Sequence, residues 1–246
     1  MPQELSKAIS RFMPLDPARV AEHDEHYEQV HTRYIRELYA DVPEMVAYHQ
    51  DRVLAQHDLA GGWEPPSGAW RFVVSRYRAG VQAAGPMPAH IRRRVEADHR
   101  TFMRGLRTCA VRETTLLDRR SGQTALQKYV IELDRAPGVD AAAASAVVAR
   151  AADALRDATG ARLVLANEVL AERASRPLDE PGQGLPGEAL PATDKLAFLE
   201  LYFDHADWGR AFFASCRTVV DELCWDETIA RGAVYEVEER CGIDRR

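Results

Sequence analysis

Imidazole and phenol side chains recur at helical spacing between residues 23 and 34. At about 100° per residue they fall within one helix sector of about 140°, and they are His23, His26, Tyr27, His31 and Tyr34. Burying such groups without partners costs roughly 1–3 kcal/mol each, so we expect the sheet, ordered water or a ligand opposite them. His31 is the first candidate for a general base or acid, because an imidazole with a pKa near ~6.5 transfers protons at neutral pH. Tyr27, Tyr34 or, on a later strand, Tyr48 could donate a hydrogen bond to a developing oxyanion.

A second group of polar side chains lies in the run MVAYHQDRV, residues 45–53. Tyr48, Gln50 and Arg52 alternate there with His49 and Asp51, so the two sets face opposite sides of a strand. One set should face the helices and the other the space between the sheets, and the sequence leaves open which. His49 and Asp51 could act as a base and its orienting carboxylate, and Arg52 could hold a carboxylate or an enolate.

Structural roles are the alternative for both groups. The helix residues could be core histidines and tyrosines satisfied by Asp51, Ser10 or backbone carbonyls, and the strand residues could form a hydrogen-bond network. We predict no metal site: the histidine spacings approximate those of helix-borne ligands, but no carboxylate is placed to complete a set and the HExxH motif is absent. The histidines expected to face solvent are His57, His90 and His99.

The composition is typical of a water-soluble globular chain. Its 246 residues are 46% apolar and 28% charged, enough for one large or two small domains. The net charge of −6 lacks the surplus of Lys and Arg that nucleic-acid binding requires. No apolar run approaches the ~20 residues that cross a bilayer, and no export signal is visible, so we expect a cytoplasmic protein without membrane or nucleic-acid partners. The four cysteines form no C-x-x-C pattern and are expected to be reduced, buried thiols.

Local patterns predict the same order of strands and helices twice. Alternating apolar residues favour strands, and amphipathic stretches favour helices. Strands are predicted over residues 7–13, 45–55, 70–77 and 108–117, with helices over 18–39 and 89–106. The order repeats with strands over 126–133, 162–171, 195–203 and 233–239 and helices over 139–159 and 207–224. Pro/Gly-rich loops over 61–68 and 175–194 occupy matching places.

Each set of elements is βαββαβ, the ferredoxin-like arrangement. Two such sets about 120 residues apart indicate an internal duplication, with halves at residues 1–122 and 123–246. Each half has an open sheet face that the other half can cover. The sequence therefore predicts an α+β fold in which two tandem ferredoxin-like halves pack sheet to sheet within one chain.

Residues 16–53 resemble the EthD-type domain of the dimeric α/β-barrel superfamily. The resemblance rests on the His26-Tyr27 pair, on His31 four residues later, on the turn at Pro43 and on a strand that bears Tyr48. The carboxy-terminal part, with residues 196–204 and 237–239, resembles the third strand, second helix and closing strand of the same domain. The pattern spans much of both halves, but motif identity covers only residues 16–53, and it is more specific for the fold than for the reaction.

The resemblance implies a tandem, fused dimeric α/β barrel with a pocket between the helices and the sheet of a half. The second half has the Ala-rich stretch 141–152 where the first has its histidines, so we expect one active pocket, in the N-terminal half, and a structural C-terminal half. The further residues expected to bind substrate are His23, His26, Tyr34, Tyr48, Trp70 and Phe72.

Three functions are compatible with these features. The first is a biosynthetic tailoring enzyme that dehydrates, isomerises or cyclises a small aromatic or polyketide-like molecule by His/Tyr acid–base chemistry without a cofactor. The resemblance also implies an oxygenase of the same substrates, either cofactor-independent or using reduced flavin as a cosubstrate. The third is a haem-binding or non-catalytic ligand-binding protein. The sequence leaves the substrate and a possible homodimer open.

Overall fold

The computed structural model describes residues 5–40, 42, 44–58, 62–64, 70–78, 89–121, 125–158, 160–175, 188–189, 195–215 and 229–245. The N-terminal half comprises β1 (Leu5–Pro14), the 3₁₀ turn η1 (Pro17–Arg19), α1 (Val20–His26), the π-helical turn η2 (Tyr27–His31), α2 (Thr32–Ala40), β2 (Met45–Asp58), β3 (Gly62–Glu64), β4 (Arg71–Arg78), α3 (Ala89–Phe102) and β5 (Met103–Asp118). The C-terminal half comprises β6 (Gln127–Arg135), α4 (Ala141–Ala158), β7 (Leu163–Ser175), β8 (Glu188–Ala189), β9 (Lys195–Phe203), α5 (Ala206–Ser215) and β10 (Ile229–Asp244).

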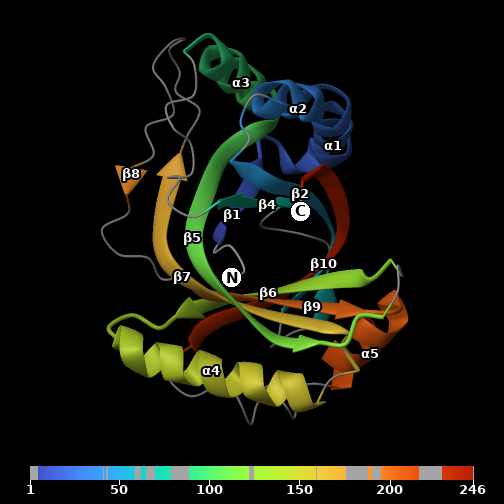
Figure 1. The fold of residues 1–246 in the computed structure, drawn as a ribbon, viewed down its shortest axis with the longest axis vertical. Helices are drawn as coiled ribbons and strands as arrows, with labels where there is room; N and C mark the ends of the chain where they lie inside the picture. Colours follow the sequence, from blue (N-terminus) through green and yellow to red (C-terminus); the bar gives the residue numbers. More distant parts are fainter. Residues whose placement is uncertain are drawn as a thin grey trace.

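The strands of the two halves close into one antiparallel barrel (Figure 1). The strand order is β5-β1-β4-β2 in the first half and β10-β6-β9-β7 in the second, which is the same ferredoxin-like order twice. Hydrogen bonds between β5 and β7 and between β10 and β2 join the two sheets at both edges. The predicted fold class is confirmed, and these two seams leave the main strands without an open edge.

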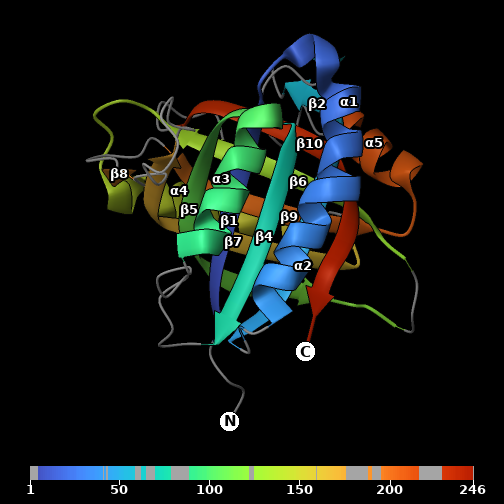
Figure 2. The same ribbon diagram turned by 90° about the horizontal axis from the view of Figure 1, so that it is seen from above.

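Helices cover the outside of the barrel on two opposite sides (Figures 1 and 2). The helices α1, α2 and α3 pack on the first sheet over a core that includes Phe12, Ile35 and Phe102. The helix α4 packs on the second sheet through its small and branched residues, such as Ala151 and Leu155. A third cluster, including Phe72 and Phe198, fills part of the barrel interior, which we call the lumen.

Two predicted helices differ from those observed. The helix over 18–39 is present but contains the π-helical turn Tyr27–His31, a feature often found at functional sites. The predicted helix over 89–106 ends at Phe102, because Met103 and Leu106 pair with β1 and the demands of the sheet override local helical preference.

Some predictions fall partly or wholly on residues outside the described ones. Among them are residues 216–224 of the last predicted helix, most of the loops 61–68 and 175–194, and the side chains of three of the four cysteines. Cys109 is buried and free, as predicted. No helix in the described ranges has the length and apolar character to cross a membrane.

Candidate functional site

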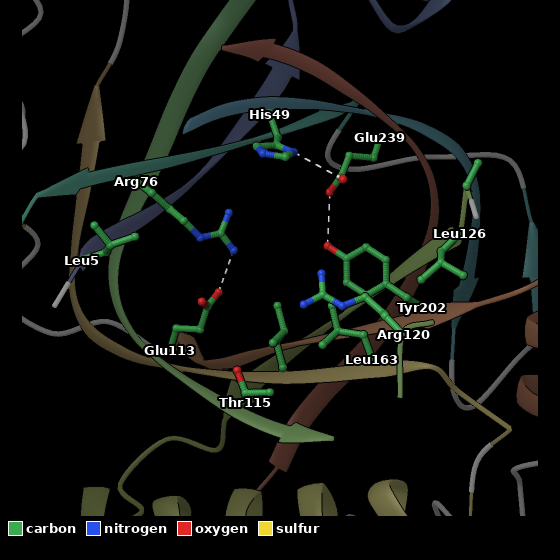
Figure 3. A pocket seen from close by; sticks show the side chains of 12 residues that line it. Leu5, His49, Arg76, Glu113, Thr115, Arg120, Leu126, Leu163, Tyr202 and Glu239 are labelled. Carbon is green, nitrogen blue, oxygen red and sulfur yellow. Dashed lines mark hydrogen bonds and ion pairs between the residues drawn. The ribbon is translucent and has the colours of Figure 1, made fainter. Parts of the chain in front are cut away.

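A cavity of about 530 Å³ lies in the lumen (Figure 3). Both halves line it, and its size is typical of sites for small molecules. Leu5 is 37% exposed and the Arg120 side chain is 50% exposed, so the cavity meets solvent on their side. The lining residues are Leu5, His49, Arg76, Glu113, Thr115, Arg120, Ala125, Leu126, Leu163, Leu165, Tyr202 and Glu239.

The strand β2 presents one set of polar residues to the helices and the other to the lumen. On the helix side, Gln50 accepts a hydrogen bond of 3.0 Å from Thr32, and the Arg52 guanidinium lies 2.6 Å from the Asp24 carboxylate. On the lumen side, His49 lines the cavity and Asp51 lies behind its wall. Closure of the barrel therefore shows which set of side chains faces the lumen, a question that the alternation along the strand left open.

His49 is a buried imidazole beside a carboxylate. Its side chain is 8% exposed, and its Nδ1 lies 3.3 Å from Oε1 of Glu239 on the neighbouring strand β10. Both ring nitrogens are buried, and neither makes a hydrogen bond in the described part of the chain. The expected partner, Asp51, is instead bound by the Lys128 ammonium at 2.6 Å, so Glu239 is the carboxylate placed to orient this imidazole.

A connected set of ion pairs includes three residues of the cavity wall, Arg76, Glu113 and Glu239, and we call it the lumen network. Its three cations and four carboxylates in the described residues are Lys7, Arg76 and Lys128, and Asp51, Glu113, Glu200 and Glu239. Lys128 Nζ lies 2.8 Å from Glu200 and 3.0 Å from Glu239. Lys7 binds both Glu113 and Glu200, and Arg76 lies 2.7 Å from Glu113.

In this network, burial and the neighbouring charges shift the pKa values of the carboxylates in opposite directions. Burial raises the pKa of Asp51 to about 6, although Lys128 counteracts the shift. Burial would also raise the pKa of Glu239, but the Lys128 ammonium and the neighbouring His49 ring hold it well below its usual range. Burial raises the pKa of the Tyr202 hydroxyl well above its ordinary value, so this phenol stays protonated and donates to the Glu200 or Glu239 carboxylate, each 3.2 Å away.

Two guanidinium groups point into the cavity from opposite sides (Figure 3). Arg76 comes from β4 and is paired with Glu113. Arg120 follows β5, and its Nε and Nη2 bind the Asp118 carboxylate at 2.9 and 2.6 Å. Each lining arginine is thus paired with a carboxylate, which Arg76 shares with Lys7, and the leucines of the wall supply the apolar surface between them.

The strand register shows which positions of the two halves correspond. In the first half Lys7 on β1 is paired with Arg76 on β4, and in the second half Lys128 on β6 is paired in the same way with Tyr202 on β9. At the two seams, Asp51 on β2 is paired with Glu239 on β10, and Asn167 on β7 is paired with Glu113 on β5. The corresponding pairs around the cavity are therefore Lys7 and Lys128, Arg76 and Tyr202, Glu113 and Glu239, Asp51 and Asn167, and His49 and Leu165. One lysine and one glutamate are therefore present in both halves, while the guanidinium of Arg76, the carboxylate of Asp51 and the imidazole of His49 are each present on one side.

The residues of the predicted helix face form a packed cluster elsewhere. Tyr27 and His31 are 0% and 1% exposed, and the rings of Trp70, His99 and Phe102 surround them. His31 Nδ1 lies 2.8 Å from the Asp98 carboxylate. His31 Nε2 and both ring nitrogens of His99 have no hydrogen-bond partner among the described residues. Neither the lumen cavity nor the groove between α2 and α3 is lined by Tyr27 or His31, and their catalytic role stays a prediction.

The other predicted site residues are spread over three places. His23 accepts a hydrogen bond from the Asp16 backbone at 3.3 Å, and His26 lies 2.6 Å from Asp98. Tyr48 contacts the Tyr27 hydroxyl, Trp70 donates to Asp24 at 2.6 Å, and Phe72 belongs to the apolar part of the lumen. Tyr34 lines the groove between α2 and α3, which has a volume of about 130 Å³. Of all the site residues predicted from the sequence, His49 is the one that lines the lumen cavity.

Several residues of the site were missed by the sequence interpretation. Glu239, Tyr202 and Arg76 line the cavity, and Lys128 binds Glu239 from behind. One signal was available: the chain has only three lysines, and Lys7, Lys128 and Lys195 all lie within strands and are buried. A buried lysine needs a carboxylate partner, which points to the acidic residues of the facing strands. The prediction that His57 and His99 face solvent was wrong, since both are buried, whereas His90 is exposed as expected.

The buried imidazole of His99 predicts a pH-dependent stability. Burial lowers the pKa of His99 to about 3, so between pH ~6.5 and that value the unfolded chain binds a proton that the folded chain does not. This residue therefore lowers the free energy of unfolding by up to ~1.4 kcal/mol for each unit of falling pH. His99→Phe should flatten the decline in urea midpoint between pH 7 and 4.5, and exposed His205→Gln should not. Equal slopes in His99→Phe and the wild type would contradict this account.

Comparison with known proteins supports the fold. No protein-family model matches the chain, and no curated protein sequence matches it. A proposed monooxygenase from Fusobacterium nucleatum has a similar structure, with a TM-score of 0.52 and 10% identity over 98% of this chain and 95% of that chain. An anthrone oxidase-like protein has a TM-score of 0.47 and 12% identity over 100% of this chain and 96% of that chain. A proposed monooxygenase from Lactobacillus acidophilus has a TM-score of 0.47 and 9% identity over 96% of this chain and 95% of that chain.

The likeness to the Fusobacterium structure covers nearly the whole of both chains. At this low identity it establishes the fold alone, and that fold is the dimeric α/β barrel expected from the resemblance. The EthD-type domain is not singled out by these comparisons and stays a prediction.

Proposed function

We propose that the chain is an enzyme that removes a proton from a small, mostly apolar aromatic or polyketide-like molecule bound in the lumen cavity. His49 acts as the general base, and Glu239 orients its ring. Arg76 stabilises the negative charge that develops on a hydroxyl or carbonyl oxygen of the substrate. No cofactor is needed for this step.

The observation that carries the proposal is the environment of His49. Nδ1 lies 3.3 Å from the Glu239 carboxylate, so a neutral ring with its proton on Nδ1 would keep its lone pair on Nε2, to which no described residue is hydrogen-bonded. This is the tautomer that a base requires, and the imidazole lines a cavity of about 530 Å³. The leucines of the wall would pack on the apolar body of the substrate.

Proton removal is the first step of several reactions of such molecules. Dehydration, isomerisation and cyclisation each proceed from the resulting enolate or phenolate. Oxygenation of the same anion is a second candidate, favoured by the name of the Fusobacterium neighbour, a proposed monooxygenase. The helix-face residues Tyr27 and His31 remain the alternative site predicted from the sequence.

Incubation with a panel of hydroxylated aromatic and polyketide-like molecules tests this proposal. We expect mass spectrometry to reveal a product from at least one member without added flavin or haem. A product isomeric with its substrate, or lighter by one water, supports acid–base chemistry, whereas an added oxygen together with oxygen uptake supports the second candidate. Leu165→Trp, which narrows the cavity, should lower the yield of the product. Full activity in that variant would overturn the assignment of the cavity.

A further inference from the structure

We infer that the lumen cavity selects uncharged molecules with an acidic hydroxyl and discriminates against carboxylates of the same shape. This inference rests on the proposed function and adds the charge of the substrate to it. Three features of the cavity support it: the charge balance of the lumen network, the prior pairing of both lining arginines, and the charge change that accompanies proton transfer to His49.

The lumen network carries one negative charge in excess when its carboxylates are ionised. In the described residues its four carboxylates face three cations, and two of these carboxylates, Glu113 and Glu239, lie on the cavity wall itself. A unit charge about 8 Å away, at an effective dielectric constant of about 20, changes a binding constant by about thirtyfold. An anionic ligand is therefore opposed by the wall that it contacts.

The two lining arginines do not reverse this conclusion. Arg76 is bound to Glu113 at 2.7 Å, and Arg120 holds Asp118 through two nitrogens. A carboxylate that approached either guanidinium would meet the charge of the carboxylate already bound there. Two arginines that converge on a cavity would normally indicate an anion site, but here each already holds a carboxylate.

A neutral hydroxyl compound brings its own proton and avoids this penalty. When its proton moves to His49, the imidazolium supplies the missing positive charge, and the lumen network together with His49 becomes neutral. The conjugate base then forms beside Arg76 and the new imidazolium. The same charge balance that disfavours a carboxylate in the resting cavity thus favours an oxyanion formed inside it.

A matched pair of fluorescent probes tests the inference. 6-Hydroxy-2-naphthamide and 6-hydroxy-2-naphthoate have nearly the same shape and differ by one charge at pH 7.5. Isothermal titration should show that the amide binds at least about tenfold more tightly than the carboxylate. Glu113→Gln removes the excess negative charge and should bring the two affinities together. Arg76→Gln should widen the difference.

The control and the remaining outcomes separate this inference from the proposed function. Glu168→Gln alters a half-buried glutamate that pairs with Arg112 on the outside of the barrel, and it should leave the preference unchanged. Equal binding of the probes, or tighter binding of the carboxylate, would overturn the inference while leaving the cavity as a binding site. If neither probe bound to the wild type, both the inference and the proposed function would be overturned. The same holds if Leu165→Trp failed to weaken the binding of the probes.

Discussion

Replacing His49 with glutamine is expected to lower the rate of turnover by about 10²–10⁴-fold, the usual contribution of a general base. Glutamine retains hydrogen-bonding groups and a similar length, so Glu239 keeps a donor and the lumen network keeps its charges. The loss should therefore appear in kcat, with the urea midpoint of the variant close to that of the wild type. Stopped-flow or mass-spectrometric rates on the substrate found in the panel give the measurement.

The matched control for this variant is His31→Gln. His31 is buried against Asp98 and the ring of His99, so its replacement should lower the free energy of unfolding and leave turnover within a few-fold of the wild type. The opposite pattern, with turnover lost in His31→Gln and kept in His49→Gln, would place the base on the helix face that the sequence first indicated.

Replacing Lys128 with methionine is expected to lower the free energy of unfolding by about 3–5 kcal/mol, because it leaves buried carboxylates without their cation. Asp51 and Glu200 are 0% and 1% exposed at the side chain, and Lys128 lies within 2.8 Å of both. Urea unfolding at constant m-value measures the loss. The loss should be larger at pH 8 than at pH 5, since carboxylates deprived of the ammonium can take up protons as the pH falls.

Arg112→Met provides the comparison for the lysine variant. It also removes a cation paired with a glutamate, but the Arg112 side chain is 64% exposed, and exposed pairs contribute only about 0–1 kcal/mol. Similar losses in both variants would show that burial of the lumen network has no special weight in the stability of the barrel.

The order of strands and helices could be predicted because it depends on local patterns. Alternation in residues 45–55 and the helical spacing of residues 18–39 are readable without knowledge of the rest of the chain. The duplication of that order then indicated two ferredoxin-like halves. The π-helical turn and the early end of α3 were not predicted, because each depends on packing against a sheet that local patterns do not describe.

The site was predicted only in part, for a geometric reason. The alternation of β2 placed His49 and Asp51 on one face, but only closure of the barrel shows that this face looks into the lumen. The partner of His49 is Glu239, on a strand at the far end of the chain that is brought alongside by the β2–β10 seam. Likewise Asp98 and His99 reach His31 from another helix. Contacts of this kind follow from topology, and spacing along the sequence does not reveal them.

The correspondence between the two halves has a consequence for how a guest molecule is oriented. In an assembly of two identical chains, every group near the axis of symmetry would occur twice, and a ligand there could bind equally well in two directions. The fused chain has His49 where its other half has Leu165, and Arg76 where the other half has Tyr202. A flat, asymmetric molecule would therefore bind one way round, and the chemistry would be directed to a single position on its ring.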